Sequence, residues 1–433
     1  MEEIRKENSP EMQSLIIHNL GPVKDCCVDI KDFMVFTGEQ ASGKSTVAKS
    51  IFFFKNIPFL LNAEITKGRN VMSSDVLKLP LRDVLIKAIR MNFLRTFGTS
   101  WSMNSDMYMT YTYKSGITIK VSLTPDDRSP NYIWIDLSTD LTRFLKDLEQ
   151  LDMENISLDQ IQLFFGSFSE VIYIPAGRSM LTLLSDQLGY IYASMDDVQK
   201  RSLDYCMQNY LEMILKFKPF FSKDLKTLID ETFSLTSIKL DRSLLNHAQK
   251  LISEILQGEY KNVNGEERLF LSDGHYVKIN FASSGQQEAV WILNLLFYFL
   301  LNKKNAYFII EEPEAHLYPN VQKLITEFIA LVKSDQNQVL VTTHSPYILG
   351  SLNNLLYAGE ISEMVDKQEL DKIIPCECRL YREQFTAYNM EDGRLKPCMD
   401  EDGKQIQSEV IDGASDAINE EYDQLVALRY GRE

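Results

Sequence analysis

The residues with the clearest chemical signature form a glycine-rich loop, Gly38-Glu-Gln-Ala-Ser-Gly43-Lys44-Ser45-Thr46. The loop has the pattern G-x-x-x-x-G-K-[ST], in which glycines let backbone N–H groups curl around phosphates. Lys44 would neutralise the β- and γ-phosphates, and the Ser45 hydroxyl would hold Mg²⁺. An apolar run precedes the loop and a helix-like stretch follows it, which favours a nucleotide site over a chance match. We expect this site to comprise Gly38, Gln40, Ala41, Ser42, Gly43, Lys44, Ser45 and Thr46.

Two carboxylates come directly after another apolar run, at residues 306–310. Acids at the carboxyl end of a buried strand lie where α/β sheets bind ligands. We expect Glu311 to contact Mg²⁺ through water and Glu312 to polarise the attacking water as general base. The alternative is a solvated acidic turn after a core strand. The phosphate loop earlier in the chain favours the catalytic interpretation.

Two further patterns carry weaker signals. Ser283, Ser284, Gly285 and Gln286 stand before a long apolar helix pattern, so they make a second anion-binding corner at a helix N-terminus. Ser and Gly are also common helix caps, so this pattern alone indicates little. His344 follows the apolar run that starts at residue 339 and would reach a γ-phosphate, although a single histidine is more often structural.

The order of these four elements resembles the ABC-type ATPase superfamily. The loop at 38–46 is similar to its Walker A motif, residues 282–287 to its signature, 309–314 to Walker B and 342–345 to its histidine switch. The phrases IIEEPEAHLYP and VLVTTHSPYIL resemble the OLD, RecF and SMC-like branch, and OLD-like ATPases most of all. The resemblance covers about residues 11–55 and 262–355 well.

This resemblance implies a mechanism. Two ATPase heads would sandwich two ATP molecules, so that Ser283 and Gly285 act on the nucleotide of the other subunit. Glu312 would be the base and His344 the γ-phosphate sensor. Two departures stand out, because Glu311 replaces the usual aspartate and the signature reads SSGQQ instead of LSGGQ. The altered signature implies slow turnover.

Periodicity predicts the elements that position these residues. We expect strands at 14–19 and 27–36 joined by the turn at Gly21-Pro22, and a helix at 44–55. A mainly helical stretch is expected at 56–105, a hairpin and a third strand within 107–138, and a helix at 139–151. Further on we expect a strand at 170–175, three or more helices in 186–257, and short strands in 259–281. The last block alternates helix 286–302, strand 306–310, helix 319–333 and strand 338–342, and the tail from 391 is expected to be irregular before a helix at 414–428.

The predicted fold class is α/β: an ABC-ATPase head with a P-loop sheet core, a small β-rich segment and a mainly helical insertion. The predicted parts are an N-terminal ATPase core with Walker A (1–60), an inserted helical and β-hairpin segment (61–168), a returning core strand (169–185), a helical subdomain (186–260), the part with signature, Walker B and histidine switch (261–360), and an acidic C-terminal tail region (361–433).

Composition limits the class of protein. The chain has 433 residues and a formal charge of −16, which excludes a generally basic nucleic-acid coat protein but not a local basic patch. Six of the seven basic residues between 67 and 95 are considered as either such a patch for duplex DNA or an ordinary solvated helix face: Lys67, Arg69, Arg82, Lys87, Arg90 and Arg95. The longest apolar run, 289–301, is too short to span a bilayer, so we expect a cytoplasmic protein without membrane contact.

The six cysteines fit free thiols in a reducing cytosol. Cys376, Cys378 and Cys398 are three candidate ligands of a structural zinc site, but no fourth Cys or His lies near them in the sequence, so free thiols are favoured over a metal site.

Three functions remain open at this point. The first is an ATPase, homodimeric or larger, that controls a separate effector such as a nuclease or toxin, as in the anti-phage systems that OLD-like ATPases resemble. The second is a RecF or SMC-like ATPase that binds double-stranded DNA in repair or maintenance. The soluble subunit of a transporter is disfavoured by the OLD-like Walker B. The 78 residues after 355 are too few for the Toprim nuclease domain of OLD proteins, so no nuclease activity is expected in this chain.

Overall fold

A computed structural model describes the chain at 13–70, 79–98, 104–123, 132–151, 155–167, 169–183, 190, 194–196, 199, 204–235, 240–334 and 337–430. Its main feature is an 11-stranded sheet in the order β6-β5-β4-β1-β2-β14-β13-β3-β12-β11-β7. The strands of this sheet are β1 Ser14–Leu20, β2 Val23–Asp29, β3 Phe33–Gly38, β4 Tyr108–Lys114, β5 Ile117–Leu123, β6 Ile133–Leu137, β7 Glu170–Ile174, β11 Ala306–Glu311, β12 Gln338–Thr342, β13 Phe385–Glu391 and β14 Arg394–Pro397.

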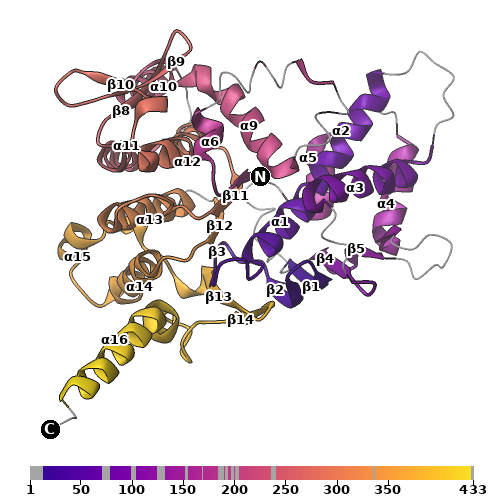
Figure 1. The fold of residues 1–433 in the computed structure, drawn as a ribbon. Coiled ribbons are helices and arrows are strands. Elements are labelled where there is room, and N and C mark those ends of the chain that lie inside the picture. Colours follow the sequence, from indigo (N-terminus) through magenta and orange to yellow (C-terminus); the bar gives the residue numbers. More distant parts are fainter. Residues whose placement is uncertain are drawn as a thin grey trace.

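The half of the sheet that carries the candidate site is parallel. Strands β13, β3, β12, β11 and β7 all run in one direction. Helices cover both faces of these strands, which is why they read as continuous apolar runs. In β3, Met34 and Phe36 pack on the α1 side, whereas Phe33 and Val35 pack into the core beneath α11–α14. Figure 1 shows α1 on one side of these strands and α11–α14 on the other.

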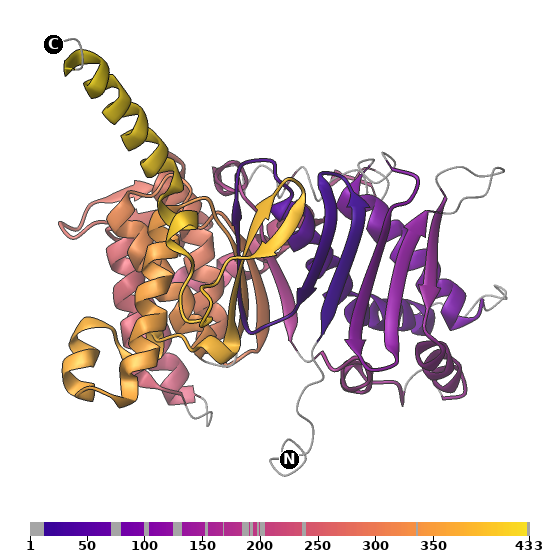
Figure 2. The same cartoon turned by 90° about the horizontal axis from the view of Figure 1, so that it is seen from below.

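The other half of the sheet is antiparallel. Strands β6, β5, β4, β1 and β2 pair as an antiparallel ladder, so the small β-rich segment extends the main sheet. Figure 2 shows these strands side by side with the parallel half. A second sheet, of three strands, consists of β8 Glu259–Val263, β9 Glu266–Phe270 and β10 Tyr276–Lys278.

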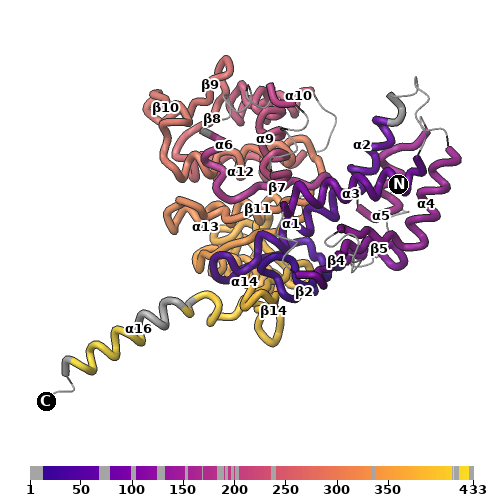
Figure 3. Tube along the Cα trace, turned by 45° about the vertical axis from the view of Figure 1, so that its right-hand side comes forward, coloured from indigo at the N-terminus to yellow at the C-terminus, as the bar shows by residue number. Residues whose placement is uncertain are grey.

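The helices at 44–55, 139–149, 284–301 and 319–334 lie close to where they are predicted, whereas the helices at 158–165, 346–360 and 367–373 have no predicted counterpart. The helices that cover the antiparallel strands and the α1 side are α1 Lys44–Lys55, α2 Ile57–Asn70, α3 Leu81–Phe97, α4 Thr139–Glu149 and α5 Leu158–Phe165. The remaining α-helices are α6 Ser179–Leu183, α9 Tyr205–Phe217, α10 Leu225–Leu235, α11 Arg242–Leu256, α12 Ser284–Leu301, α13 Pro319–Ser334, α14 Pro346–Glu360, α15 Lys367–Ile373 and α16 Ser408–Tyr430. In all three views, and most plainly in Figure 3, α16 extends away from the rest of the molecule.

The predicted α/β fold is confirmed, with two corrections to its elements. The expected strand at 27–36 is divided into β2 and β3, because β2 pairs antiparallel with β1 whereas β3 pairs parallel with β12 and β13, so the chain must reverse between them. The stretch after 391 is not irregular throughout. It turns at Asp392-Gly393 into β14, which pairs with β13, and its helix begins at Ser408.

Parts of the predicted helical stretches, at 71–78, 99–103, 184–189 and much of 191–203, lie outside the described residues. Among the helices that are described, none is long and apolar enough to cross a membrane.

Candidate nucleotide site

The phosphate loop connects β3 to α1, as its motif requires. Gly38 and Gly43 have φ of 127° and 117°, which L side chains rarely adopt. A Cβ at Gly38 would lie 2.4 Å from the Met390 carbonyl oxygen of β13, so the neighbouring strand also demands glycine there. Gly43 is the N-cap of α1 and offers no side-chain cap, which leaves the first N–H groups of the helix free for an anion.

Lys44 folds back over this loop. Its ammonium donates to the carbonyl oxygens of Gly38, at 2.8 Å, and Glu39, at 2.7 Å. The residue is only 5% exposed, and burial lowers the pKa of its ammonium, while the carboxylates of Glu312, Glu314 and Glu311 act in the opposite direction. Lys44 is thus held at the loop by main-chain oxygens that a phosphate would compete with.

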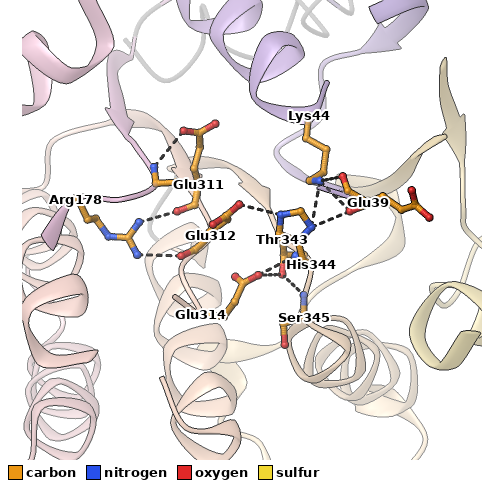
Figure 4. A network of polar contacts seen from close by, with 11 residues as sticks. Glu39, Lys44, Arg178, Glu311, Glu312, Glu314, Thr343, His344 and Ser345 are labelled. Carbon is orange, nitrogen blue, oxygen red and sulfur yellow. Dashed lines mark hydrogen bonds and ion pairs between the residues drawn. The ribbon is translucent and has the colours of Figure 1, made fainter. Parts of the chain in front are cut away.

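The register of three parallel strands brings the remaining residues to the same edge. Thr342 of β12 pairs with Phe36 of β3 on one side and with Glu311 of β11 on the other. The phosphate loop, the carboxylates and the histidine segment therefore leave the sheet at one level, next to one another (Figure 4). This is the edge at which α/β sheets bind ligands.

His344 bridges the loop and the carboxylates. Its Nδ1–H donates to the Gly38 carbonyl oxygen and its Nε2–H donates to Glu312 Oε1, each at 2.9 Å. The hydrogen bond to Glu312 raises the pKa of His344. The same hydrogen bond lowers the pKa of Glu312, and the charge of His344 lowers it further. Lys44 Nζ also lies 3.3 Å from Nδ1, and the charge of Lys44 acts against the rise in the pKa of His344.

Glu314 holds the backbone of His344 in place through hydrogen bonds to residues 343 and 344. Its Oε1 accepts hydrogen bonds from Thr343 Oγ1 at 2.6 Å and from the His344 backbone N–H at 2.8 Å. Glu312 itself has φ of 43°, in the left-handed region, and its N–H donates to the Thr342 carbonyl oxygen at 2.8 Å. The sequence pattern included Glu314 in its motif but assigned it no contact, since spacing alone does not say which way a side chain points after a strand ends.

Glu311 is placed to fit a metal ion. It is 4% exposed, its Oε2 accepts from the Ala176 N–H at 3.2 Å, and its Oε1 has no hydrogen-bond partner in the described part of the chain. A buried carboxylate oxygen with free lone pairs suits Mg²⁺ or a water bound to it. Ser45 lies exposed in the first turn of α1. Mg²⁺ usually takes one or two protein ligands together with phosphates and water, so these two residues fit it.

The signature-like residues form the N-terminus of α12. Ser283 is the N-cap, and its hydroxyl accepts from the Gln286 N–H while Gln286 Oε1 accepts from the Ser283 N–H. A Cβ at Gly285 would lie 2.7 Å from the His316 carbonyl oxygen, so this corner packs on the segment after Walker B. Within the described residues, no hydrogen bond or ion pair joins 283–286 to the phosphate loop at 38–46.

Three of the solved structures that are similar to this chain share at most 14% identity with it, at TM-scores of 0.36 to 0.40. Similar solved structures include the SMC head domain from Thermotoga maritima (10% identity, 89% of this chain and 98% of that one, TM-score 0.36). They also include the SmcHead bound to the C-winged helix domain of ScpA (14%, 90% and 97%, TM-score 0.40) and a Pyrococcus furiosus Smc head with an extended coiled coil bound to the C-terminal domain of ScpA (13%, 89% and 95%, TM-score 0.38). No curated protein matches the chain.

The sequence profile of the AAA ATPase domain family matches residues 166–349. That range contains residues 283–286, Glu311, Glu312 and His344. The phosphate loop at 38–46 lies outside it and follows β3, the strand that pairs with β12. Residues 166–349 are therefore similar to the AAA ATPase domain family. This match supports the prediction of an ATPase that the order of the motifs gives.

Four of the six basic residues considered as a patch have a partner within the described part of the chain. Arg90 donates to the Ile133 carbonyl oxygen at 3.0 Å, and Arg95 contacts Gln208 and lies over the Tyr205 ring. Lys67 pairs with Glu64 at 2.6 Å and Arg82 with Asp83 at 3.4 Å. The side chain of Arg69 lies outside the described part, and Lys87 is exposed on α3.

The described part of the chain shows no zinc site formed by Cys376, Cys378 and Cys398. Cys376 is exposed whereas Cys378 and Cys398 are buried. No group of three or more His, Cys, Asp or Glu side chains among the described residues is arranged to hold a metal ion.

Proposed function

We propose that this ATPase hydrolyses ATP at an interface between two copies of the chain, and that its nucleotide state controls a separate effector protein. The observation that carries the catalytic part is the hydrogen-bonded chain from the phosphate loop through His344 to Glu312, with both bonds at 2.9 Å. It joins a phosphate-binding element to a carboxylate that can act as a base.

The proposed reaction uses Glu312 as general base. Water would attack the γ-phosphorus, its proton would pass to the Glu312 carboxylate, and the bond to the bridging oxygen would break to release ADP. A carboxylate bound to an imidazolium is a weak base, because its charge is already compensated. We therefore infer that His344 exchanges Glu312 for a γ-phosphate oxygen when ATP binds, which frees Glu312 for the water.

Lys44 would change partners in the same step. Its ammonium would leave the Gly38 and Glu39 carbonyl oxygens and bind the β- and γ-phosphates, as its position in the motif implies. Ser45 and Glu311 would hold Mg²⁺, which would screen the charge of the phosphates. The free Glu311 Oε1 supports this assignment.

The signature corner would act across a dimer. Ser283 and Ser284 are exposed at the start of α12, where free N–H groups favour an anion. The absence of a bond from 283–286 to the phosphate loop within the described residues agrees with a role on the nucleotide of the second subunit. A larger symmetric assembly is compatible with the same contact.

The effector part of the proposal rests on the resemblance to OLD-like ATPases of anti-phage systems. There the ATPase state sequesters or activates a nuclease or toxin. We propose the same role in defence for this chain. DNA binding in the manner of RecF remains the second candidate, but two arginines of the 67–95 stretch are engaged inside the molecule.

The test is ATP turnover of the purified chain with and without duplex DNA at two salt concentrations. We expect turnover that ignores DNA, falls about 10²- to 10⁴-fold in Glu312→Gln, and is lost with ATP binding in Lys44→Ala. Glu363→Gln, which changes an exposed acid outside the site, is the matched control and should behave as the unmodified chain. Stimulation by DNA that weakens with salt would support the RecF-like function instead. Normal turnover in Glu312→Gln would refute the assigned base.

A further inference from the structure

Arg178 is a fully buried arginine that the proposed reaction does not use. It lies between β7 and α6, with 0% of its surface exposed. Its guanidinium donates to the carbonyl oxygens of Pro175, Glu311, Glu312 and Glu288, at distances of 2.8 to 3.0 Å. A planar fork with five N–H donors suits such a set of acceptors, whereas a lysine ammonium has only three donors at one point.

Two of these bonds hold the backbone of the proposed base. Nη1 donates to the Glu311 carbonyl oxygen at 2.8 Å, and Nη2 to that of Glu312 at 3.0 Å. Glu312 has a left-handed φ of 43°, which L side chains rarely adopt without support from their surroundings. Figure 4 shows Arg178 on one side of this backbone and the Glu312 carboxylate reaching His344 on the other. Arg178 therefore fixes the peptide from which the Glu312 side chain projects.

The other end of the guanidinium holds α12. Nε donates to the Glu288 carbonyl oxygen at 2.9 Å and lies 3.3 Å from Glu288 Oε2. Glu288 Oε1 accepts from the Ser179 N–H at 3.1 Å, so the carboxylate also anchors the segment that carries Arg178. Glu288 lies in the second turn of α12, the helix that Ser283 caps. One buried group thus connects the signature helix to the Walker B backbone.

We infer that Arg178 is a positioning residue, which makes the signature end of α12 and the Glu312 peptide move as one unit. The inference rests on the proposed function. Since each signature would contact the nucleotide of the other subunit, contact at one site would be passed through Arg178 to the base of the second site. Engagement of the signature of its own chain would then favour the hydrolytic position of Glu312.

Arg178→Lys tests this inference in the full-length chain. We expect kcat to fall about 10- to 100-fold while the affinity for a non-hydrolysable ATP analogue changes less than about threefold, because the base is misplaced but the phosphate loop is intact. Arg379→Lys is the matched control. Arg379 is also buried, yet its donors go to Ile374 and Asp371, outside the site. The Arg379→Lys variant shows how much stability is lost when a buried guanidinium outside the site is replaced by an ammonium group.

A second measurement does not depend on hydrolysis. Amide hydrogen exchange should become faster in Arg178→Lys both at residues 309–316 and in the first turns of α12, and in neither segment in Arg379→Lys. Glu288→Gln keeps the backbone acceptor and removes the charge, so it should show the same pattern of exchange with a smaller fall in kcat. The Glu288→Gln variant replaces Arg178→Lys in both measurements if Arg178→Lys does not fold.

The outcomes separate the two proposals. Unchanged exchange in both segments, or equal losses of kcat and stability in the Arg178 and Arg379 variants, would overturn the positioning role. If the unmodified chain hydrolyses no ATP, the proposed function is wrong, and the exchange measurement still decides whether Arg178 connects α12 to Glu312.

Discussion

His344 Nε2 donates to Glu312 Oε1 at 2.9 Å, although the two residues are 32 positions apart and follow different strands. The parallel pairing of β11 with β12 places both strand ends at one level, and Glu314 holds the His344 backbone in place. The proposed base and the proposed sensor are therefore hydrogen-bonded to each other, and each shifts the pKa of the other towards its charged form. The proposed exchange of partners on ATP binding would turn this pair into an active site.

The pair should make stability depend on pH. The pKa of His344 is raised above 6.5, so its contribution is complete below pH 6.5 and is lost as pH rises through the folded-state pKa. The pKa of Glu312 is lowered below 4.5, so its contribution is complete above pH 4.5 and is lost as pH falls through the folded-state pKa. Without nucleotide, His344→Gln should therefore cost most stability between these two values.

Urea unfolding of the unmodified chain and of the His344→Gln variant measures the difference in their free energies of unfolding. Because the side chains of His344 and Glu312 are about one-third exposed, we expect His344→Gln to lower the free energy of unfolding by no more than ~1 kcal/mol near pH 6. The loss should become smaller towards pH 9. A difference that grows from pH 6 to pH 9 would contradict the charged pair.

Gly38→Ala should destabilise the fold as well as the loop. The new methyl group would lie 2.4 Å from the Met390 carbonyl oxygen, at a φ of 127°. We expect a loss of about 2–4 kcal/mol in the free energy of unfolding, because strain and a backbone clash act together. Gly350→Ala is the control, since its Cβ meets nothing within 4 Å and its helix favours alanine. Equal stability of the two variants would show that β13 does not constrain the loop.

Turnover should require Mg²⁺ and depend on Glu311. Chelation should abolish hydrolysis, and added Mg²⁺ should restore it. Glu311→Gln should raise the Mg²⁺ concentration for half-maximal turnover about tenfold or more, because the amide is a weaker ligand than the carboxylate. The measurement is a Mg²⁺ titration of ATP hydrolysis, with Glu363→Gln in parallel. An unchanged midpoint for Glu311→Gln would remove Glu311 from the metal site.

A mixture of two inactive variants should regain activity if the signature acts across a dimer. Ser284→Arg blocks the exposed corner without removing the Ser283 cap, and Lys44→Ala disables the phosphate loop. Equal amounts that exchange freely should recover up to about a quarter of normal turnover, since half of the dimers are mixed and each has one site with an intact phosphate loop and an intact signature. Recovery is smaller to the extent that Glu312 of that site also depends on the blocked signature of its own chain. ATP hydrolysis before and after mixing checks this. No recovery from exchanging dimers would contradict a shared site.

Local sequence predicted much of the parallel half of the sheet and the helix after the phosphate loop. The helix at 44–55 and the strands before Glu311 and His344 lie where apolar periodicity placed them, because both faces of a parallel sheet are covered and every residue of such a strand must be apolar. The meeting of Lys44, Glu312 and His344 follows from the rule that parallel strands bind ligands at their carboxyl ends.

Pairing between distant segments was decided only by the tertiary structure. The polar strand β14 and its partner β13 enter the sheet next to β3, and β13 packs directly on Gly38. The segment YIPAGRS, which contains Arg178, resembles a segment of the OLD, RecF and SMC-like ATPases, but the sequence assigns Arg178 no role. Only burial against the backbones of Glu311, Glu312 and Glu288 gives it a set of acceptors. Apolar periodicity reports which face of an element is buried, whereas the choice of neighbour depends on contacts between residues far apart in the chain.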